Sequence, residues 1–472
     1  MQDILLGTWK TSIACCLGAT LFCSAVGAES GPAAGTEGGA AKKRERKGPL
    51  KDLPSKPTGA HLAAIKALGG NSWVDLGSPA PDPEWGKARG RSWSPRAPFA
   101  PDMRGAFYFG EGPHGMVKSN GHYMDDLWFY DLNQHRWICV YPGIRAAEGY
   151  KRISFDDRTG FEVTPDGQPI PIASMVHAYC MVTYDTHRKL FMNMPCPGAY
   201  WKPGYHKGIT GRVEARKAHK QALEKAKAAG KNPAWEGSKG SSPYIYNSVT
   251  GRFERYRTKG KSSPGGFGAT LLYVPSVRKA FGYKNRSSQV AWYDPDAKDW
   301  IGISKKGNLP PWHIDPNSCY DSKRDRIYLA GGIYPARGRE IKPGESALWT
   351  FDVRTETFSR LEPKANPTPT SYATNRAMFF YDSVNDAAVL FFHRSKKDSA
   401  GIFVYHPGKN EWEVVAKNPP ELKRRGNPTW TGFYDPELNA FLLHTACDGR
   451  DNGTMWAYRY KRAGGQSKSK EK

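Results

Sequence analysis

The stretch Asp125-Asp126-Leu127-Trp128-Phe129-Tyr130-Asp131, followed by Trp137, decides the fold of this chain. It combines an alternating apolar strand, a polar turn and a second strand that opens on an aromatic residue, a pattern typical of a β-hairpin. The same aromatic spacing recurs at Tyr246 and Phe253, Tyr293 and Trp300, Phe351 and Phe358, and Tyr405 and Trp412. Because one hairpin cannot bury its own apolar face, the repetition predicts units that stack on one another.

A second signature gives the number of units. Upstream of each hairpin, an aromatic residue and a turn precede another apolar strand, at Phe99 to Asp102, Tyr184-Asp185, Leu272-Tyr273, Tyr320-Asp321, Tyr381-Asp382 and Tyr434-Asp435. Six four-stranded units predict an all-β fold, a six-bladed β-propeller. We interpret the aspartates of these turns as turn formers that bond their own backbone, not as repeated acidic sites.

The two ends of the repeat region predict how the ring closes. The last unit has a third strand, Met455 to Tyr460, but no aromatic strand after it. Residues 71–77, which contain Trp73, resemble a fourth strand with no third strand before it. We therefore expect the 71–77 strand to complete the C-terminal blade. A degenerate seventh blade within residues 141–174 is the alternative, although no aromatic pair supports it.

At these residues the chain resembles the kelch family of β-propellers. The spacing of Tyr130 and Trp137 carries the resemblance, which covers roughly residues 71–460. The double glycine of that family occurs here only at Gly331-Gly332. The likeness to the galactose-oxidase and sialic-acid-mutarotase propellers within this group is weaker.

The N-terminal region has a pattern typical of a targeting segment. Residues 1–28 hold an apolar run that ends in Val26-Gly27-Ala28, which suits signal-peptide cleavage. Residues 29–58 are rich in Gly and Ala and then in charge, and we expect a disordered basic linker there. An exported protein, periplasmic or extracellular and without a transmembrane anchor after cleavage, is the expectation.

The propeller is expected over residues 59–460, and a disordered basic tail over 461–472. Two insertions interrupt the repeat. Residues 141–174 are expected to form an extra hairpin through Phe161 to Gly167, and residues 200–242 a basic insertion whose helix spans 212–229. Loops that join blades, and those that join second to third strands, emerge on one face. That face is where a ligand site is expected.

Composition limits the partners. The chain has 472 residues and a formal net charge of +24, which favours an anionic polysaccharide or an acidic extracellular or envelope protein. Nucleic acid is disfavoured because the hairpins already account for the Trp and Tyr residues. The five cysteines after the signal segment are scattered, and no tight ligand spacing is present, so we expect no metal and no cofactor.

Aromatic rings beside Arg, Asn and His on the expected face are typical of sugar-binding clefts. The candidate binding residues are His122, Tyr200, Trp201, His206, Arg286, Arg337, Arg339, Glu340, Arg376, His393, Arg394 and His444.

We therefore expect a binding module for an anionic glycan or an extracellular protein. The alternative is a carbohydrate-active enzyme. Similarity to sialic-acid mutarotases implies an acid/base group such as Glu340 beside Arg337 and Arg339. Similarity to galactose oxidase implies a copper site near Tyr200 and Cys196, or near His444 and Cys447, whose spacing does not match. No catalytic residue is assigned.

Overall fold

The computed structural model describes a compact unit that begins at Glu45; residues 1–44 lie outside the described residues. The described residues are 45–54, 56–91, 94–110, 118–122, 124, 126–143, 154–156, 161–163, 167–169, 178–194, 220–221, 224–231, 242–259, 264, 269–284, 289–304, 306–307, 309–310, 317–330, 348–364, 377–392, 401–417, 430–446 and 450–462.

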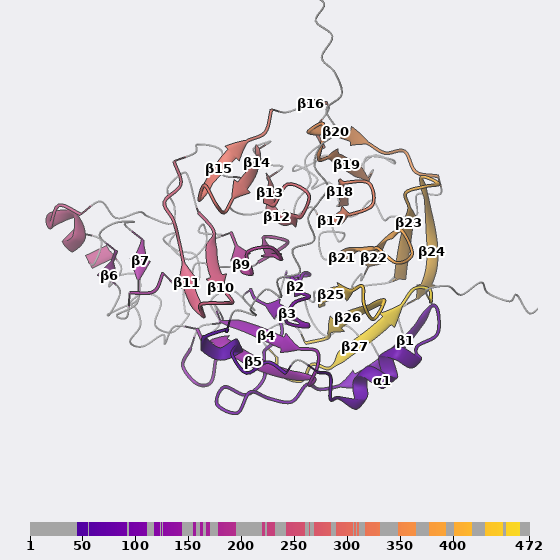
Figure 1. Cartoon of the computed structure of the whole chain (residues 1–472), viewed down its shortest axis with the longest axis horizontal. Coiled ribbons are helices and arrows are strands. Elements are labelled where there is room, and N and C mark those ends of the chain that lie inside the picture. Colours follow the sequence, from indigo (N-terminus) through magenta and orange to yellow (C-terminus); the bar gives the residue numbers. More distant parts are fainter. Residues whose placement is uncertain are drawn as a thin grey trace, which may run out of the picture. The chain divides into compact units, whose positions relative to one another are not determined.

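Six antiparallel sheets surround an axis in this unit (Figure 1). The first blade is β2 (Phe99–Ala100), β3 (Gly105–Tyr108), β4 (Leu127–Asp131) and β5 (Arg136–Tyr141). The second is β8 (Val182–Asp185), β9 (Leu190–Asn193), β10 (Tyr244–Asn247) and β11 (Arg252–Glu254). The third is β12 (Ala269–Val274), β13 (Lys279–Lys284), β14 (Gln289–Asp294) and β15 (Asp299–Gly302).

The remaining blades repeat the pattern. The fourth is β17 (Asn317–Asp321), β18 (Arg326–Ala330), β19 (Trp349–Asp352) and β20 (Thr357–Arg360), with β16 (Lys306–Gly307) added in parallel to β20. The fifth is β21 (Met378–Asp382), β22 (Ala387–Phe392), β23 (Gly401–His406) and β24 (Glu411–Lys417). The sixth is β25 (Thr431–Asp435), β26 (Ala440–His444), β27 (Met455–Arg459) and β1 (Ser72–Gly77). The six-bladed fold is confirmed.

The aromatic pairs predicted from the sequence are direct cross-strand neighbours. Tyr130 lies opposite Trp137, and the other four pairs match in the same way. Their ring centroids are 4.8 to 5.5 Å apart, a separation at which aromatic pairs attract beyond simple burial. These pairs hold together the outer two strands of the first five blades.

The predicted closure is also confirmed. Strand β1 pairs antiparallel with β27, and Trp73 lies opposite Tyr458 with ring centroids 4.8 Å apart. The hydroxyl of Tyr458 donates a 2.8 Å hydrogen bond to Asn71 Oδ1. The N-terminal strand thus supplies the aromatic partner that the last blade lacks in sequence.

The turn aspartates bond backbone amides as predicted. Asp185 Oδ1 accepts from the backbone N–H groups of His187 and Arg188, and Asp321 and Asp382 repeat this pattern two and three residues on. Several of them also join neighbouring blades, which the sequence did not predict. Tyr434 Oη donates to Asp382 Oδ1 at 2.7 Å, from the sixth blade to the fifth.

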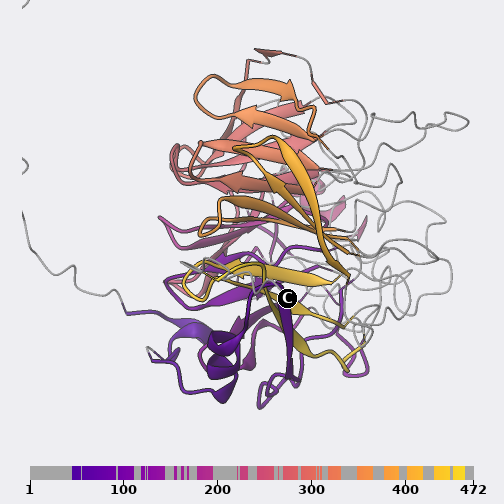
Figure 2. The same cartoon turned by 90° about the vertical axis from the view of Figure 1, so that its right-hand side faces the viewer.

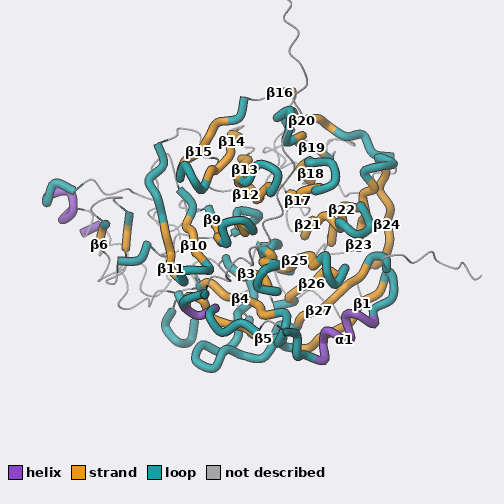
Figure 3. The backbone as a smooth tube through the Cα atoms, in the orientation of Figure 1, coloured by secondary structure: helices purple, strands orange, loops and turns teal. Residues whose placement is uncertain are grey.

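Residues 45–54, expected to be linker, are packed on the propeller. They include the 3₁₀ helix η1 (Gly48–Leu50), and Leu50 is fully buried in the core. Helix α1 (Ala60–Ala67) follows and buries Leu62 and Ile65. Figure 3 shows α1 as a helix that runs alongside β1. Burial of these apolar side chains accounts for the difference from the expected linker.

The insertions are described in part. A two-stranded hairpin pairs β6 (Ser154–Phe155) with β7 (Glu162–Val163), so the paired strands begin before the predicted 161–167 stretch. Residues 220–221 and 224–228 are helical, in agreement with the predicted inserted helix. Within the part of the chain that the structure describes, no helix is long and apolar enough to cross a membrane.

Figure 2 shows the blades edge on, with the turns that join first to second and third to fourth strands at one end. We call this end the turn face. The opposite end, where second strands lead towards third strands, is the loop face.

Candidate functional site

The axis of the propeller is filled by a segment that precedes the first blade. Arg96 pairs as a parallel bridge with Gly432 of β25. Its guanidinium donates to the carbonyl oxygens of Cys180 (3.4 Å) and Leu271 (2.8 Å), and to Ser318 Oγ (2.9 Å) and O. One side chain thus joins the inner edges of the second, third and fourth blades.

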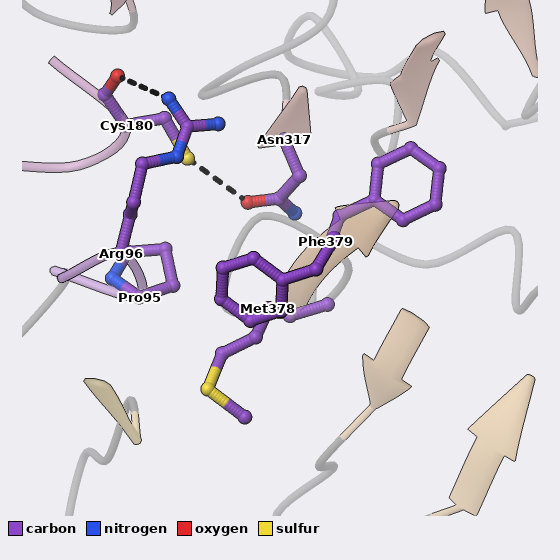
Figure 4. Close-up of a pocket in the computed structure, with 8 residues that line it drawn as sticks. Pro95, Arg96, Cys180, Asn317, Met378 and Phe379 are labelled. Carbon is purple, nitrogen blue, oxygen red and sulfur yellow. Dashed lines mark hydrogen bonds between the residues drawn. The ribbon is translucent and has the colours of Figure 1, made fainter. Parts of the chain in front are cut away.

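A narrow pocket adjoins this arginine (Figure 4). Cys180 Sγ donates to Asn317 Oδ1 at 3.3 Å, and Met378 and Phe379 form an apolar side. The pocket is too narrow to admit a water molecule. Since both Nη atoms of Arg96 are engaged with the protein, we assign this pocket a structural role.

A second polar site lies at the loop-face end of the first blade. We call Trp85, Lys87, Arg89, Ser119 and His122 the blade-1 corner. The rings of Trp85 and His122 meet edge to face with centroids 5.4 Å apart. Both side chains are half-buried, while Lys87 and Ser119 are exposed, and Arg89 Nη2 donates to Ser119 Oγ at 3.2 Å. The corner therefore presents aromatic surface beside two cations.

The loop that carries Trp85 is held rigidly. Asp82 and Gly86 exchange two backbone hydrogen bonds, and Asp82 Oδ1 accepts from the backbone N–H groups of Glu84 and Trp85. Asp82 Oδ2 accepts from the backbone N–H of Cys139 on β5. The indole is therefore presented by a fixed backbone, which reduces the entropy lost when a ligand binds.

The imidazole of His122 is also oriented. Its Nδ1 lies 2.6 Å from the carbonyl oxygen of Gly143. Because a carbonyl only accepts, Nδ1 carries the proton and Nε2 of the neutral ring is an acceptor. Nε2 makes no hydrogen bond to another described residue, and the ring lies edge to face with the indole of Trp85.

A buried charge cluster lies next to the corner. Asp126 forms salt bridges with Arg91 (2.7 Å) and Lys118 (2.9 Å) and accepts from Trp128 Nε1 (2.7 Å). Burial opposes the charge of Asp126, but the two cations and Trp128 together lower its pKa to about 2. Two cations therefore share one carboxylate in the interior.

The positive charge of this cluster is not fully compensated. The Arg91 side chain is fully buried, and its Nε and Nη2 have no hydrogen-bond partner among the described residues, although its guanidinium lies over the ring of Tyr108. The corner, the cluster and the loop that carries Trp85 together hold Lys87, Arg89, Arg91 and Lys118 against Asp82, Glu84 and Asp126, a net charge of +1. The net charge of this region is therefore positive, as is the formal net charge of the whole chain.

His444 lies in the interior and not on an open binding face. It is 2% exposed, and its Nδ1 lies 3.0 Å from the hydroxyl of Tyr108. Burial, together with the charge of Arg91, lowers its pKa to about 3. Its position at the end of β26, where the side chain packs against Tyr108 and Trp137, explains this burial.

Of the candidates named from the sequence, only His122 and His444 are described. The others, Tyr200, Trp201, His206, Arg286, Arg337, Arg339, Glu340, Arg376, His393 and Arg394, lie outside the described residues. The residues proposed for an enzymatic site, Glu340 with its two arginines, are among them. Sequence reasoning overlooked Trp85, although the polar stretch Asp82-Pro-Glu-Trp-Gly86 signals a turn that displays an aromatic residue.

The described part of the chain contains no group of three His, Cys, Asp or Glu side chains placed to hold a metal ion. The thiols of Cys139, Cys180 and Cys319 are buried.

No family model and no curated protein matches the chain. Among solved structures, it is similar to an oligogalacturonate lyase in complex with manganese, at 9% identity and a TM-score of 0.38, over 83% of this chain and 98% of that one. It is also similar to the GH74 xyloglucanase from Xanthomonas campestris, at 9% identity and a TM-score of 0.39, over 83% of this chain and 56% of that one. A third similar structure is an auxiliary nutrient binding protein from Bacteroides ovatus, at 10% identity and a TM-score of 0.39, over 82% of this chain and 76% of that one. Similarity at this level carries no argument about function.

Proposed function

We propose that this chain is an exported kelch-type propeller that acts as a binding module for an anionic glycan. The observation that carries the proposal is the blade-1 corner, in which a half-buried indole lies beside an oriented imidazole and two cations. An acidic extracellular or envelope protein is the other partner that this chemistry fits.

The corner provides an apolar face, a hydrogen-bond acceptor and two cations, which are the groups that bind an acidic sugar. The indole of Trp85 supplies a flat apolar face for the C–H groups of a pyranose ring. Nε2 of His122 accepts from a hydroxyl, and Lys87 and Arg89 attract a uronate or sulfate group. The buried excess charge of Arg91 and Lys118 adds a favourable potential that water screens less than it screens surface charge.

Binding to alginate, a polyuronate, and to neutral dextran tests the proposal. Trp85→Ala is expected to weaken alginate binding about ten-fold or more, because a buried aromatic anchor contributes much of the energy in such sites. Trp85→Phe, which keeps an apolar ring, should retain part of the affinity. Arg89→Gln should weaken binding to alginate and reduce its dependence on salt.

Lys409→Gln is the matched control, since Lys409 is an exposed cation in the β23 to β24 turn on the opposite face. Circular dichroism melts check that each variant folds. Alginate binding that is equal for the wild type, Trp85→Ala and Arg89→Gln would contradict the assignment to this corner.

A further inference from the structure

Two histidines meet where the N-terminal helix packs on the first blade. His61 lies in the first turn of α1, and His135 lies in the turn between β4 and β5. Their rings are stacked, with centroids 4.9 Å apart and an angle of 28° between the ring planes. Both side chains are half-buried. A charge on either ring therefore acts directly on the contact between the helix and the blade.

Further bonds hold the start of α1 at the same place. Nε2 of His61 lies 2.6 Å from the carbonyl oxygen of Leu132, to which it donates. The backbone N–H of Thr58, just before the helix, donates to the carbonyl of Asn133 at 3.1 Å. The Asn133 side chain in turn donates from Nδ2 to the carbonyl of Pro54 at 2.9 Å. The segment that enters α1 is thus docked on the β4 to β5 turn.

The other end of α1 is tied to the blade that closes the ring. Arg459 on β27 donates to the carbonyl oxygens of Ile65 and Leu68. The helix buries Leu62 and Ile65 and leads directly into β1, the closing strand. Helix α1 therefore links the first blade to the closure of the ring.

The surroundings of His61 favour its neutral form. Burial lowers the pKa of His61, although its bond to Leu132 and the carboxylate of Asp131 act in the opposite direction. Asp131 is itself paired with Arg136, at 3.2 Å. Its attraction for a charged His61 is weakened by that pairing, so burial decides the direction of the shift.

The surroundings of His135 act in the same way. Burial, followed by the charge of His61, lowers the pKa of His135 to about 4. On β1, Asp75 and the backbone at 76–77 favour the charged form. Asp75 is exposed, however, and water screens its charge. The hydroxyl of Tyr130, 2.7 Å from Nδ1, is neutral and adds no charge. Docking of the helix therefore requires neutral rings.

We propose that the stacked histidines form an acid-operated latch, which holds α1 on the first blade at neutral pH and releases it as the rings become protonated. Two positive rings in contact repel each other, and each loses hydration when it is buried. Imidazole is the side chain whose charge changes between about pH 5 and 8. Release of the helix would uncover Leu62 and Ile65 and remove the support that α1 gives to β1.

The direction of the pH effect follows from the protons bound in each state. His135 takes up a proton near the ordinary pKa of 6.5 when the helix is released, but only near 4 when the helix is docked. Docking is therefore most stable above pH 6.5 and is weakened as pH falls towards 4. Between pH 7.5 and 5, His135 alone raises the ratio of released to docked helix about 30-fold.

Hydrogen exchange at pH 7.5 and at pH 5 tests the latch on the full chain. Protection factors, which correct for the intrinsic pH dependence of exchange, should fall about 30-fold in α1 at the lower pH. They should change much less in β22 of the fifth blade, because the opening is local. His135→Phe keeps an aromatic ring on His61 but cannot be protonated, and it should reduce the fall in α1 to less than about five-fold. The double variant with His61→Phe should abolish it.

His187→Gln, on an exposed turn, is the control and should respond to pH like the wild type. Circular dichroism melts at pH 7.5 check that each variant folds. Protection of α1 that is the same at both pH values in the wild type would overturn the proposal, as would a wild-type response in the double variant. An equal loss of protection in α1 and β22 would also overturn it, because acid would then unfold the ring as a whole.

Discussion

Asp126 is the residue on which the interior of the first blade depends. Its carboxylate is the only counter-charge that the described residues supply for Arg91 and Lys118. Burying ions is costly, and removing one member of such a cluster leaves the others without compensation. The sequence shows Asp126 only as the start of a strand, because Arg91 and Lys118 reach it through tertiary packing.

Asp126→Asn is expected to lower the free energy of unfolding by about 3 to 5 kcal/mol, because two buried cations then lack an anion. Urea denaturation measures the change. Asp296→Asn is the matched control, since the Asp296 side chain is 74% exposed in its salt bridge with Arg188; it should cost at most about 1 kcal/mol. Equal effects from the two variants would show that burial does not set the energy of the cluster.

His444 predicts how stability depends on pH. Its pKa is about 3 in the folded protein and near the ordinary 6.5 in the unfolded chain. Between these values the unfolded chain binds a proton that the folded protein does not, so the free energy of unfolding decreases as pH falls from 6.5 towards 3.

His444→Gln should reduce that slope by up to about 1.4 kcal/mol per pH unit, the value for one proton. Urea midpoints at a series of pH values between 4 and 8, converted with the measured m-value, give the slope. His187→Gln, on an exposed turn, is the control and should leave it unchanged. An unaltered slope in His444→Gln would mean that this histidine does not titrate with unfolding.

At the scale of elements, the aromatic hairpin could be read from the sequence with its register. Tyr130 and Trp137 stand opposite each other because the length of the turn sets the register of the hairpin. The links between blades could not be read in the same way. Asp382 was predicted as a turn former, yet it also accepts from Tyr434, and only the ring brings these two residues together.

The closing strand provides a direct comparison between two equivalent pairs. Trp73 and Trp412 each pack against the third-strand tyrosine of their blade. Trp412→Ala removes a pair within one continuous hairpin, whereas Trp73→Ala removes the pair at the closure. Each substitution should lower the free energy of unfolding by about 3 to 5 kcal/mol.

Trp73→Ala should in addition expose the edge of β27, because β1 lies far from β27 in sequence and no hairpin turn joins the two strands. Hydrogen exchange is the measurement. Faster exchange is expected at β27 in Trp73→Ala and at β23 in Trp412→Ala. If Trp73→Ala left β27 as protected as in the wild type, β1 would not be needed to hold the ring closed.

At the scale of the whole molecule, the number of blades and the closure followed from the repeat. The filling of the axis did not, since nothing in the residues before the first blade predicts that Arg96 reaches three other blades. Gly432, which forms the backbone bridge with Arg96, has no room for a side chain, because an added Cβ would lie 2.6 Å from the carbonyl oxygen of Leu442. The candidate face was predicted as a set of loop residues, of which the structure describes His122 and His444.

The pairing of β1 with β27 also governs the order in which this protein can be completed. Tyr458 and Asn71, which bond across the closure, are separated by 387 positions. The ribosome makes β1 before the other strands, and β1 has no pairing partner until β27 of the last blade has been made. A product that stops before residue 455 leaves both Trp73 and the edge of β26 uncovered, and such unpaired edges aggregate or are degraded. The ring can therefore close only after the ribosome has made the last blade.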